Sequence, residues 1–109
     1  MEIELGNYKG TSVIVLSGEI DMYTSPKLRE KLLHLVKKEA TPVIVDLSKV
    51  TYIDSSGIAT FVESFKRMKS YEGKLQLVSI PDRVMNIFNF SKLDKVFEMY
   101  GSVEDALGE

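Results

Sequence analysis

The sequence contains no cysteine, and its 109 residues include a single histidine, His34. Without cysteine, the chain has no disulfide framework and no thiolate that could bind a metal or act as a nucleophile. One imidazole also excludes any metal site that requires two histidines. We therefore predict a protein that binds no metal and requires no cofactor.

An excess of positive charge and a long apolar run are also missing. Fourteen Lys and Arg stand against 16 Asp and Glu, whereas a nucleic-acid-binding domain usually has a basic excess or a basic stripe. No apolar run approaches the roughly 20 residues that cross a bilayer. The acidic start, Met1-Glu2-Ile3-Glu4, is unlike a secretion signal. We expect a cytoplasmic protein, a monomer when free, that contacts neither nucleic acid nor membrane.

The composition that remains is that of a globular domain, with 44% apolar and 28% charged residues. A length near 100 residues is typical of one domain, so we predict a single domain over residues 1–109. Hydrophobic patterning predicts alternating strands and helices. The expected order is strand (2–8), strand (11–17), helix (from 25), strand (43–47), helix (capped within 54–56, with its apolar stripe from 58), strand (75–78), helix (81–88), strand (96–99) and helix (from 102).

This alternation predicts the α/β class, in which right-handed crossovers build a mostly parallel sheet. The two runs around Lys9-Gly10 add an antiparallel hairpin at one edge, so the predicted sheet is mixed and carries about four helices. Ser25 before Pro26 is predicted to cap the first helix. The run 43–47 is predicted to be a strand buried on both faces, ended by a polar link at Ser48-Lys49.

Residues 51–57, Thr51-Tyr52-Ile53-Asp54-Ser55-Ser56-Gly57, place a carboxylate and two hydroxyls between a strand and a helix. Any of Asp54, Ser55 or Ser56 could cap the helix, because each can accept hydrogen bonds from the free amides of the first turn. One cap suffices, however, so a second serine leaves a hydroxyl free to face solvent. The segment is therefore interpreted as a helix start that can also carry a modification site.

The same loop does not fit a serine hydrolase. The pattern G-x-S-x-G requires a glycine two places before the nucleophile, where Ile53 or Asp54 stands. The base would have to be His34, which lies off the apolar stripe of its helix and is predicted to face solvent. The seven glycines never take the spacing of a dinucleotide-binding motif or a P-loop. We predict that the protein is not an enzyme.

A second segment, Gly18-Glu19-Ile20-Asp21, ends the preceding strand. Glu19, Asp21 and Thr24 would flank the serine loop if the two strands were neighbours, which the sequence leaves open. Met22 and Tyr23 follow among polar residues. They either fold back onto the core or form an exposed apolar pair suited to a protein interface.

These segments resemble the bacterial anti-sigma factor antagonists of the STAS domain family. The resemblance rests on Gly18-Glu19-Ile20-Asp21, Leu28–Leu32, Val45-Asp46-Leu47 and above all Asp54-Ser55-Ser56-Gly57-Ile58, and it runs through nearly the whole chain in the same order. The family often has a second glycine two places after the first, where this chain has Ala59; one methyl group in a helix casts little doubt on the site.

The resemblance implies a binding protein switched by phosphorylation. The family's phosphoacceptor follows the Asp, which corresponds to Ser55, with Ser56 as the alternate. The implied partners are an anti-sigma factor that is itself a serine protein kinase, bound by the unmodified form so that the sigma factor is freed, and a metal-dependent serine phosphatase. The surface expected to bind the partner comprises Asp21, Met22, Tyr23, Thr24, Asp54, Ser55, Ser56, Gly57 and Ile58.

An alternative within the same family is a STAS scaffold or transporter-accessory subunit that is not phosphorylated. The pair of hydroxyls after Asp54 favours the switch without excluding this alternative.

Overall fold

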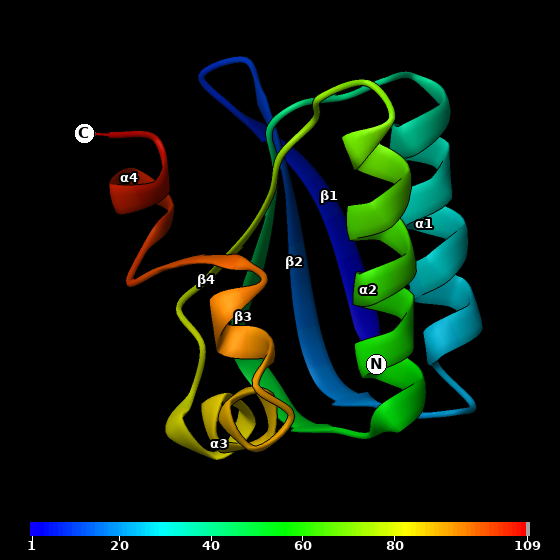
Figure 1. Cartoon of the computed structure of the whole chain (residues 1–109), viewed down its shortest axis with the longest axis vertical. Helices are drawn as coiled ribbons and strands as arrows, with labels where there is room; N and C mark the ends of the chain where they lie inside the picture. The colour runs from blue at the N-terminus through cyan, green and yellow to red at the C-terminus, as the bar shows by residue number, and fades with distance from the viewer. Residues whose placement is uncertain (109) are drawn as a thin grey trace.

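The alternating apolar residues of the first 20 positions form an antiparallel hairpin at one edge of the sheet. In the computed structural model, which describes residues 1–108, β1 (Glu2–Tyr8) pairs with β2 (Thr11–Ile20) across the turn at Lys9-Gly10. The predicted hairpin is therefore confirmed. Within residues 1–108, β1 pairs with β2 alone, so β1 forms an open edge of the sheet (Figure 1).

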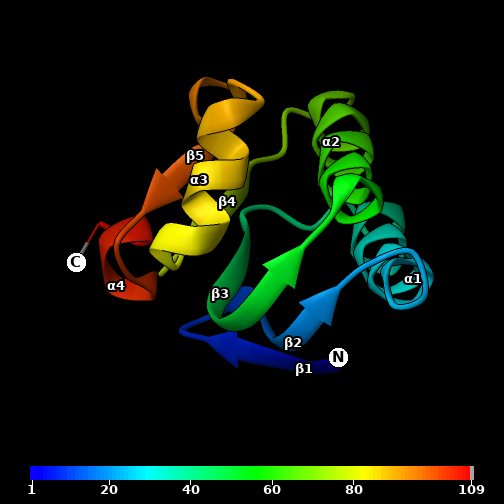
Figure 2. The same ribbon diagram turned by 90° about the horizontal axis from the view of Figure 1, so that it is seen from below.

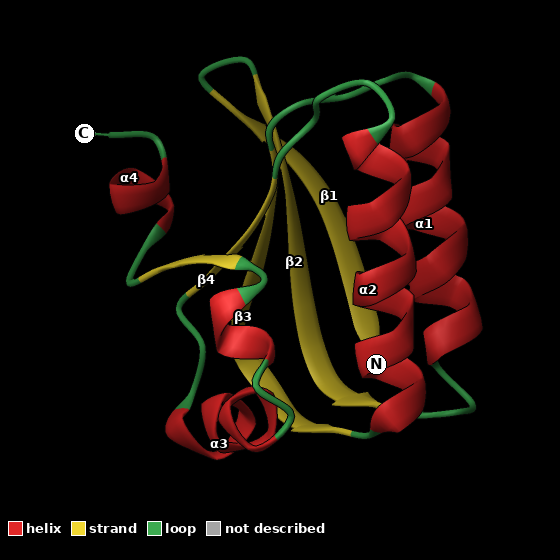
Figure 3. Cartoon of the chain, in the orientation of Figure 1, coloured by secondary structure: helices red, strands yellow, loops and turns green. Residues whose placement is uncertain are grey.

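The other strands join β2 in sequence order and in parallel. The sheet order is β1-β2-β3-β4-β5, with β3 (Val43–Ile53), β4 (Leu75–Val78) and β5 (Glu98–Tyr100). The connecting helices are α1 (Ser25–Lys37), α2 (Ser55–Lys69) and α3 (Asp82–Phe90), followed by a short 3-10 helix (Leu93–Lys95) and by α4 (Val103–Ala106) (Figure 3). The mixed α/β sheet with four helices confirms the predicted fold class.

Right-handed crossovers that always step in one direction along a sheet place their helices on the same face. Figure 2 accordingly shows α1, α2 and α3 on one side of β1, β2 and β3. The main core lies between this face and the helices, where α1 buries Leu28, Leu32 and Leu35 at helical spacing. No helix in residues 1–108 has the length and apolar content needed to cross a membrane.

The opposite face of the sheet is covered only in part. There α4 and the residue that follows it pack Val103, Ala106 and Leu107 against a second, smaller core. Its buried residues are Val13, Ile44 and Val78, which alternate with the main-core residues along their strands. The sheet is therefore buried on both faces at β4, whereas β1 has no fully buried residue on either face.

Three local predictions were wrong. Ser48 and Lys49 do not end a strand, because β3 continues to Ile53 and buries Val50 and Ile53 on the helix side. Ser25 does not cap α1: it lies inside the helix and is buried, and Thr24 occupies the cap position without a side-chain cap bond. The last strand covers Glu98–Tyr100 rather than 96–99.

Candidate functional site at the strand ends

The carboxyl ends of β2 and β3 lie side by side. Ile20 pairs with Ile53, and the Asp54 backbone N–H donates to the Ile20 carbonyl oxygen at 3.0 Å. The loops that follow these strands are therefore neighbours. This answers the question that the sequence left open, because Asp21 and Thr24 lie between β2 and α1, on the loop adjacent to the serine loop. Figure 1 shows the connections from β2 to α1 and from β3 to α2 at the same end of the sheet.

Asp54 is the cap of α2. Its Oδ1 accepts hydrogen bonds from the backbone N–H groups of Ser56 (2.9 Å) and Gly57 (3.2 Å), and from the Ser56 hydroxyl at 2.5 Å. These bonds, above all the Ser56 hydroxyl, hold the pKa of Asp54 below its ordinary value, and burial opposes them only in part. The backbone of Met22, on the neighbouring loop, contributes to the lowered pKa of Asp54 more weakly than these bonds do.

The two serines after Asp54 have different surroundings. The Ser56 hydroxyl is half-buried and is taken by Asp54. Ser55 is exposed, and no residue from 1 to 108 hydrogen-bonds its hydroxyl. The exposed hydroxyl of the pair is therefore Ser55, at the first position of α2.

Gly57 allows α2 to begin this close to the sheet. A Cβ atom at this position would lie 2.7 Å from Ile20 Cγ2 and 2.7 Å from Ile53 Cγ1, one atom from each strand. Real Cβ atoms do not approach carbon that closely, so any side chain here would push the helix start away from the strand ends. Gly57 thus fixes the position of Ser55 relative to β2 and β3.

The loop before α1 is held by its own aspartate. Asp21 Oδ1 accepts hydrogen bonds from the backbone N–H groups of Tyr23 (2.9 Å) and Thr24 (3.1 Å). The Thr24 hydroxyl donates to the Glu19 carbonyl oxygen at 2.9 Å. Met22 and Tyr23 are 64% and 85% exposed, so they do not fold back onto the core. Of the two alternatives that the sequence left open, the structure has the exposed apolar pair.

A hollow of about 590 Å³ on the surface of α2 adjoins Ser55, and sequence reasoning missed most of it. Its apolar part is formed by Ile58, Ala59 and Val62. The available signal was helical spacing, since Ala59 and Val62 follow Ser55 by four and seven positions and so share its side of the helix. Its lining residues are Ser55, Ile58, Ala59, Val62, Glu63, Lys66 and Arg67. A phosphate on Ser55 has room at this edge.

An ion-pair network borders the same hollow and connects α1 to α2. Arg29 binds Glu63 through two hydrogen bonds, Nε to Oε1 at 2.6 Å and Nη2 to Oε2 at 2.9 Å, and Arg67 approaches Glu63 at 3.3 Å. The hydrogen bond from Arg29 is the main reason that the pKa of Glu63 lies below its usual value. The bidentate geometry fixes the orientation of the two helices more than it adds stability, because the side chains are partly exposed.

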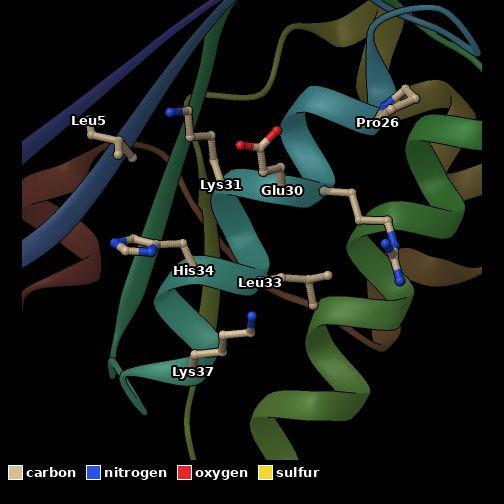
Figure 4. A pocket seen from close by; sticks show the side chains of 8 residues that line it. Leu5, Pro26, Glu30, Lys31, Leu33, His34 and Lys37 are labelled. Atoms are coloured by element: carbon tan, nitrogen blue, oxygen red, sulfur yellow. The ribbon is translucent and has the colours of Figure 1, made fainter.

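His34 lies away from the serine loop. It is exposed, as predicted, and sits in the last turn of α1, whereas the loop at Asp21–Thr24 precedes the first turn. Figure 4 shows His34 and Lys31 beside Leu5 of β1, in a hollow on the outer side of α1. Nine residues of helix separate Ser25 from His34, which is about 13 Å along the axis. The imidazole therefore does not share a site with Ser55. Among residues 1–108, no three His, Cys, Asp or Glu side chains gather as a metal site would require.

The fold and this site together define a class: a small α/β domain with a mixed sheet, in which the strand ends carry an exposed serine at a helix start. The family model of the STAS domain matches residues 2–106, and the chain belongs to the STAS domain family. The resemblance seen in the sequence is confirmed.

Relatives of known role support the same assignment. The chain is 36% identical to an anti-sigma-B factor antagonist of Listeria monocytogenes over 86 residues, which is 79% of this chain and 75% of that protein. It is 35% identical to an anti-sigma-B factor antagonist of Bacillus subtilis over 89 residues, covering 82% and 81% of the two chains.

Solved structures agree with the fold. A putative anti-sigma factor antagonist from Thermotoga maritima superposes with a TM-score of 0.91 at 19% identity, over 97% of this chain and 92% of that one. The Bacillus cell fate determinant SpoIIAA in its phosphorylated form gives a TM-score of 0.76 at 24% identity, over 98% and 97%. At these identities the likeness concerns the fold.

Proposed function

We propose that this chain is an anti-sigma factor antagonist whose binding to an anti-sigma factor is switched by phosphorylation of Ser55. Two curated relatives named anti-sigma-B factor antagonists, each more than a third identical, support the class of function. The observation that carries the switch is the contrast between neighbouring serines: Asp54 holds the Ser56 hydroxyl, whereas the Ser55 hydroxyl is exposed. The likeness to a SpoIIAA structure in phosphorylated form agrees with this.

The modification is a phosphoryl transfer catalysed by the partner. The anti-sigma factor acts as the kinase: Ser55 Oγ forms a bond to the γ-phosphorus of ATP, the bond to the ADP oxygen breaks, and the hydroxyl proton is released. A metal-dependent serine phosphatase hydrolyses the phosphoserine and restores the hydroxyl. This chain supplies the exposed acceptor and its fixed position at the start of α2.

Phosphorylation should leave the fold intact because the helix start is already satisfied. The amides of Ser56 and Gly57 donate to the Asp54 carboxylate, and the Ile58 amide donates to the Asp54 carbonyl oxygen. A phosphate on Ser55 therefore displaces no existing bond. An anion at a helix N-terminus is favoured by about 0.3–1 kcal/mol, so the added charge does not destabilise α2.

The effect falls instead on the partner. Phosphate adds about −1.5 to −2 charge and three strong acceptor oxygens at a surface that also presents Met22 and Tyr23. A hundredfold loss of affinity corresponds to about 2.7 kcal/mol. Placing a dianion against apolar or acidic partner groups costs at least that much, because the charge must be desolvated. The free chain acts as a monomer in the cytoplasm under this proposal.

Three variants test the proposal with a candidate anti-sigma kinase, ATP and mass spectrometry of the peptide spanning residues 54–66. Ser55→Ala should accept no phosphate and bind constitutively, and Ser56→Ala, the matched control, should still be labelled. Ser55→Asp should weaken binding while its melting temperature stays near that of the unmodified chain. Undiminished labelling of Ser55→Ala would move the acceptor to Ser56. No labelling of the unmodified chain, with binding retained, would favour the scaffold alternative.

A further inference from the structure

Gly6 in β1 has no structural reason to be glycine. Its φ lies outside the left-handed region, and a Cβ there would contact only the Val13 carbonyl oxygen, at an ordinary 3.8 Å. Gly57 differs, since a Cβ at that position would clash with both strands. Glycine within a strand costs about 0.5–1 kcal/mol relative to alanine. Where the fold does not require it, such a glycine often marks a place that another molecule approaches closely.

The missing side chain opens a hollow of about 300 Å³ on the face of the sheet opposite α1, α2 and α3. The register places Gly6 beside Val13 and Glu4 beside Val15, so these four residues share that face. Val13 and Val15 form the floor, and α4 closes one side with Val103 and Glu104. The full lining is Glu4, Leu5, Gly6, Asn7, Tyr8, Val13, Val15, Asp46, Val103 and Glu104.

Carboxylates surround this apolar floor. Glu4 of β1, Val15 of β2 and Asp46 of β3 lie in one row across the sheet, so an acidic side chain flanks Val15 on each side. Glu104 supplies a third carboxylate from α4. None of the described lining residues is a cation. Lys9, in the turn after β1, borders the hollow, with its Nζ 5.5 Å from the ring centroid of the lining residue Tyr8.

The hollow is separate from the serine site. Asp46 precedes Ile53 by seven strand residues, which is about 23 Å at 3.3 Å per residue, and Ser55 follows at the strand end. The hollow also lies on the face of the sheet that α2 does not cover. A molecule bound in it would leave Ser55, Met22 and Tyr23 accessible.

We propose that this hollow docks a basic amphipathic segment of a second protein partner, independently of the Ser55 switch. An apolar side chain of the segment enters beside Gly6 and contacts Val13 and Val15. Lysine or arginine side chains on either side of it pair with Glu4 and Asp46. Charge complementarity selects this occupant over a second copy of the chain, because β1 of a second copy would bring Glu2 and Glu4 toward the same carboxylates.

The test uses the full chain labelled with nitrogen-15 and a ten-residue peptide of alternating lysine and leucine. Amide shifts should map to Gly6, Val13 and Val15 and leave Ser55 unmoved, and raised salt should weaken binding. A peptide of alternating glutamate and leucine should not bind. Shifts centred on residues 54–58, or no binding of the basic peptide, would overturn the proposal.

Substitutions separate docking in the hollow from general attraction to an acidic protein. Gly6→Val fills the hollow and should weaken peptide binding at least tenfold while the melting temperature stays equal or rises. Glu4→Gln should weaken binding several-fold, whereas Glu30→Gln on α1, the matched loss of one charge, should not. If Gly6→Val bound the peptide as tightly as the unmodified chain, the proposal would be refuted. It would also be refuted if the chain self-associated and Gly6→Val abolished that association, because the hollow would then hold a second copy of the chain. Ser55→Asp should bind the peptide as tightly as the unmodified chain does. The docking test can therefore succeed or fail whatever the outcome of the Ser55 phosphorylation test.

Discussion

Two helices begin side by side at the strand ends, each after an aspartate, yet they expose opposite kinds of side chain. At the start of α1, both hydroxyl residues are engaged by the fold: Thr24 donates to the Glu19 carbonyl oxygen, and Ser25 is buried. In the first turn of α2, the packed residue is Gly57 and the exposed one is Ser55. A hydroxyl after a strand is therefore not by itself a modifiable site. It must also lack a partner inside the fold.

The loop before α1 supplies the apolar counterpart. Its exposed residues are Met22 and Tyr23, fixed by the bonds of Asp21 to the following amides. The two loops are joined through the strand ends, where the Asp54 backbone N–H donates to the Ile20 carbonyl oxygen. A charge placed on Ser55 thus appears next to the apolar side chains best suited to a protein interface. Under the proposed function, the loop before α1 would contribute affinity for the partner and Ser55 would carry the switch.

Among the predicted changes, substitution of Gly57 should have the largest effect on stability. Gly57→Val should lower the free energy of unfolding by about 2–3 kcal/mol, because the new side chain overlaps Ile20 and Ile53. For a domain near 100 residues this lowers the melting temperature by roughly 10 °C. Thermal unfolding by circular dichroism measures it. Gly6→Ala is the matched control and should keep or raise the melting temperature, since its Cβ makes an ordinary contact and alanine costs a strand less than glycine. An unchanged melting temperature for Gly57→Val would mean that α2 can shift freely.

The next largest effect should come from the apolar loop. Tyr23→Ala should weaken binding of the anti-sigma partner by tenfold or more, because exposed aromatic side chains are frequent anchors of interfaces. The free energy of unfolding of the Tyr23→Ala variant should change by less than about 0.5 kcal/mol, since Tyr23 is 85% exposed. Titration calorimetry compares it with Tyr52→Ala, an exposed tyrosine within β3. Equal losses for both variants would remove this loop from the interface.

Asp54→Ala tests the cap that orients the serines. Loss of the cap should cost about 1 kcal/mol at pH 7. The folded pKa of Asp54 is depressed, so its contribution is complete above the ordinary aspartate pKa near 4 and is lost as pH falls through the lower folded value. Urea unfolding should therefore show the difference from the unmodified chain shrinking below about pH 4. A difference that is constant from pH 7 to pH 2 would show that charge on Asp54 does not contribute.

The sequence predicted the order of elements and the serine loop because both depend on local patterns. Apolar periodicity located the helices, and the cap and glycine around Ser55 are adjacent in sequence. The errors arose where tertiary contacts override local preference. Ser48 and Lys49 look like a link, yet β3 continues through them because Val50 and Ile53 are buried against the helices.

That the loops before α1 and α2 lie side by side could not be predicted, for the same reason. It depends on the pairing of Ile20 with Ile53, a long-range register that no local motif encodes. The same holds for Arg29 and Glu63, which lie 34 residues apart. The Ser25 cap failed because its backbone was already inside the helix, where its hydroxyl is buried.

The smallest expected effect distinguishes the two serines without any partner. Ser56→Ala removes the hydroxyl donor to Asp54, so the pKa of Asp54 should rise toward its ordinary value and the free energy of unfolding should fall by about 0.5–1 kcal/mol. Ser55→Ala should leave both quantities unchanged, because Asp54 accepts no bond from that hydroxyl. Carbon-13 NMR titration of the Asp54 carboxyl measures the pKa directly. If Ser55→Ala moved that pKa as far as Ser56→Ala, both hydroxyls would be engaged by the cap, and the structural reason for assigning phosphorylation to Ser55 would be lost.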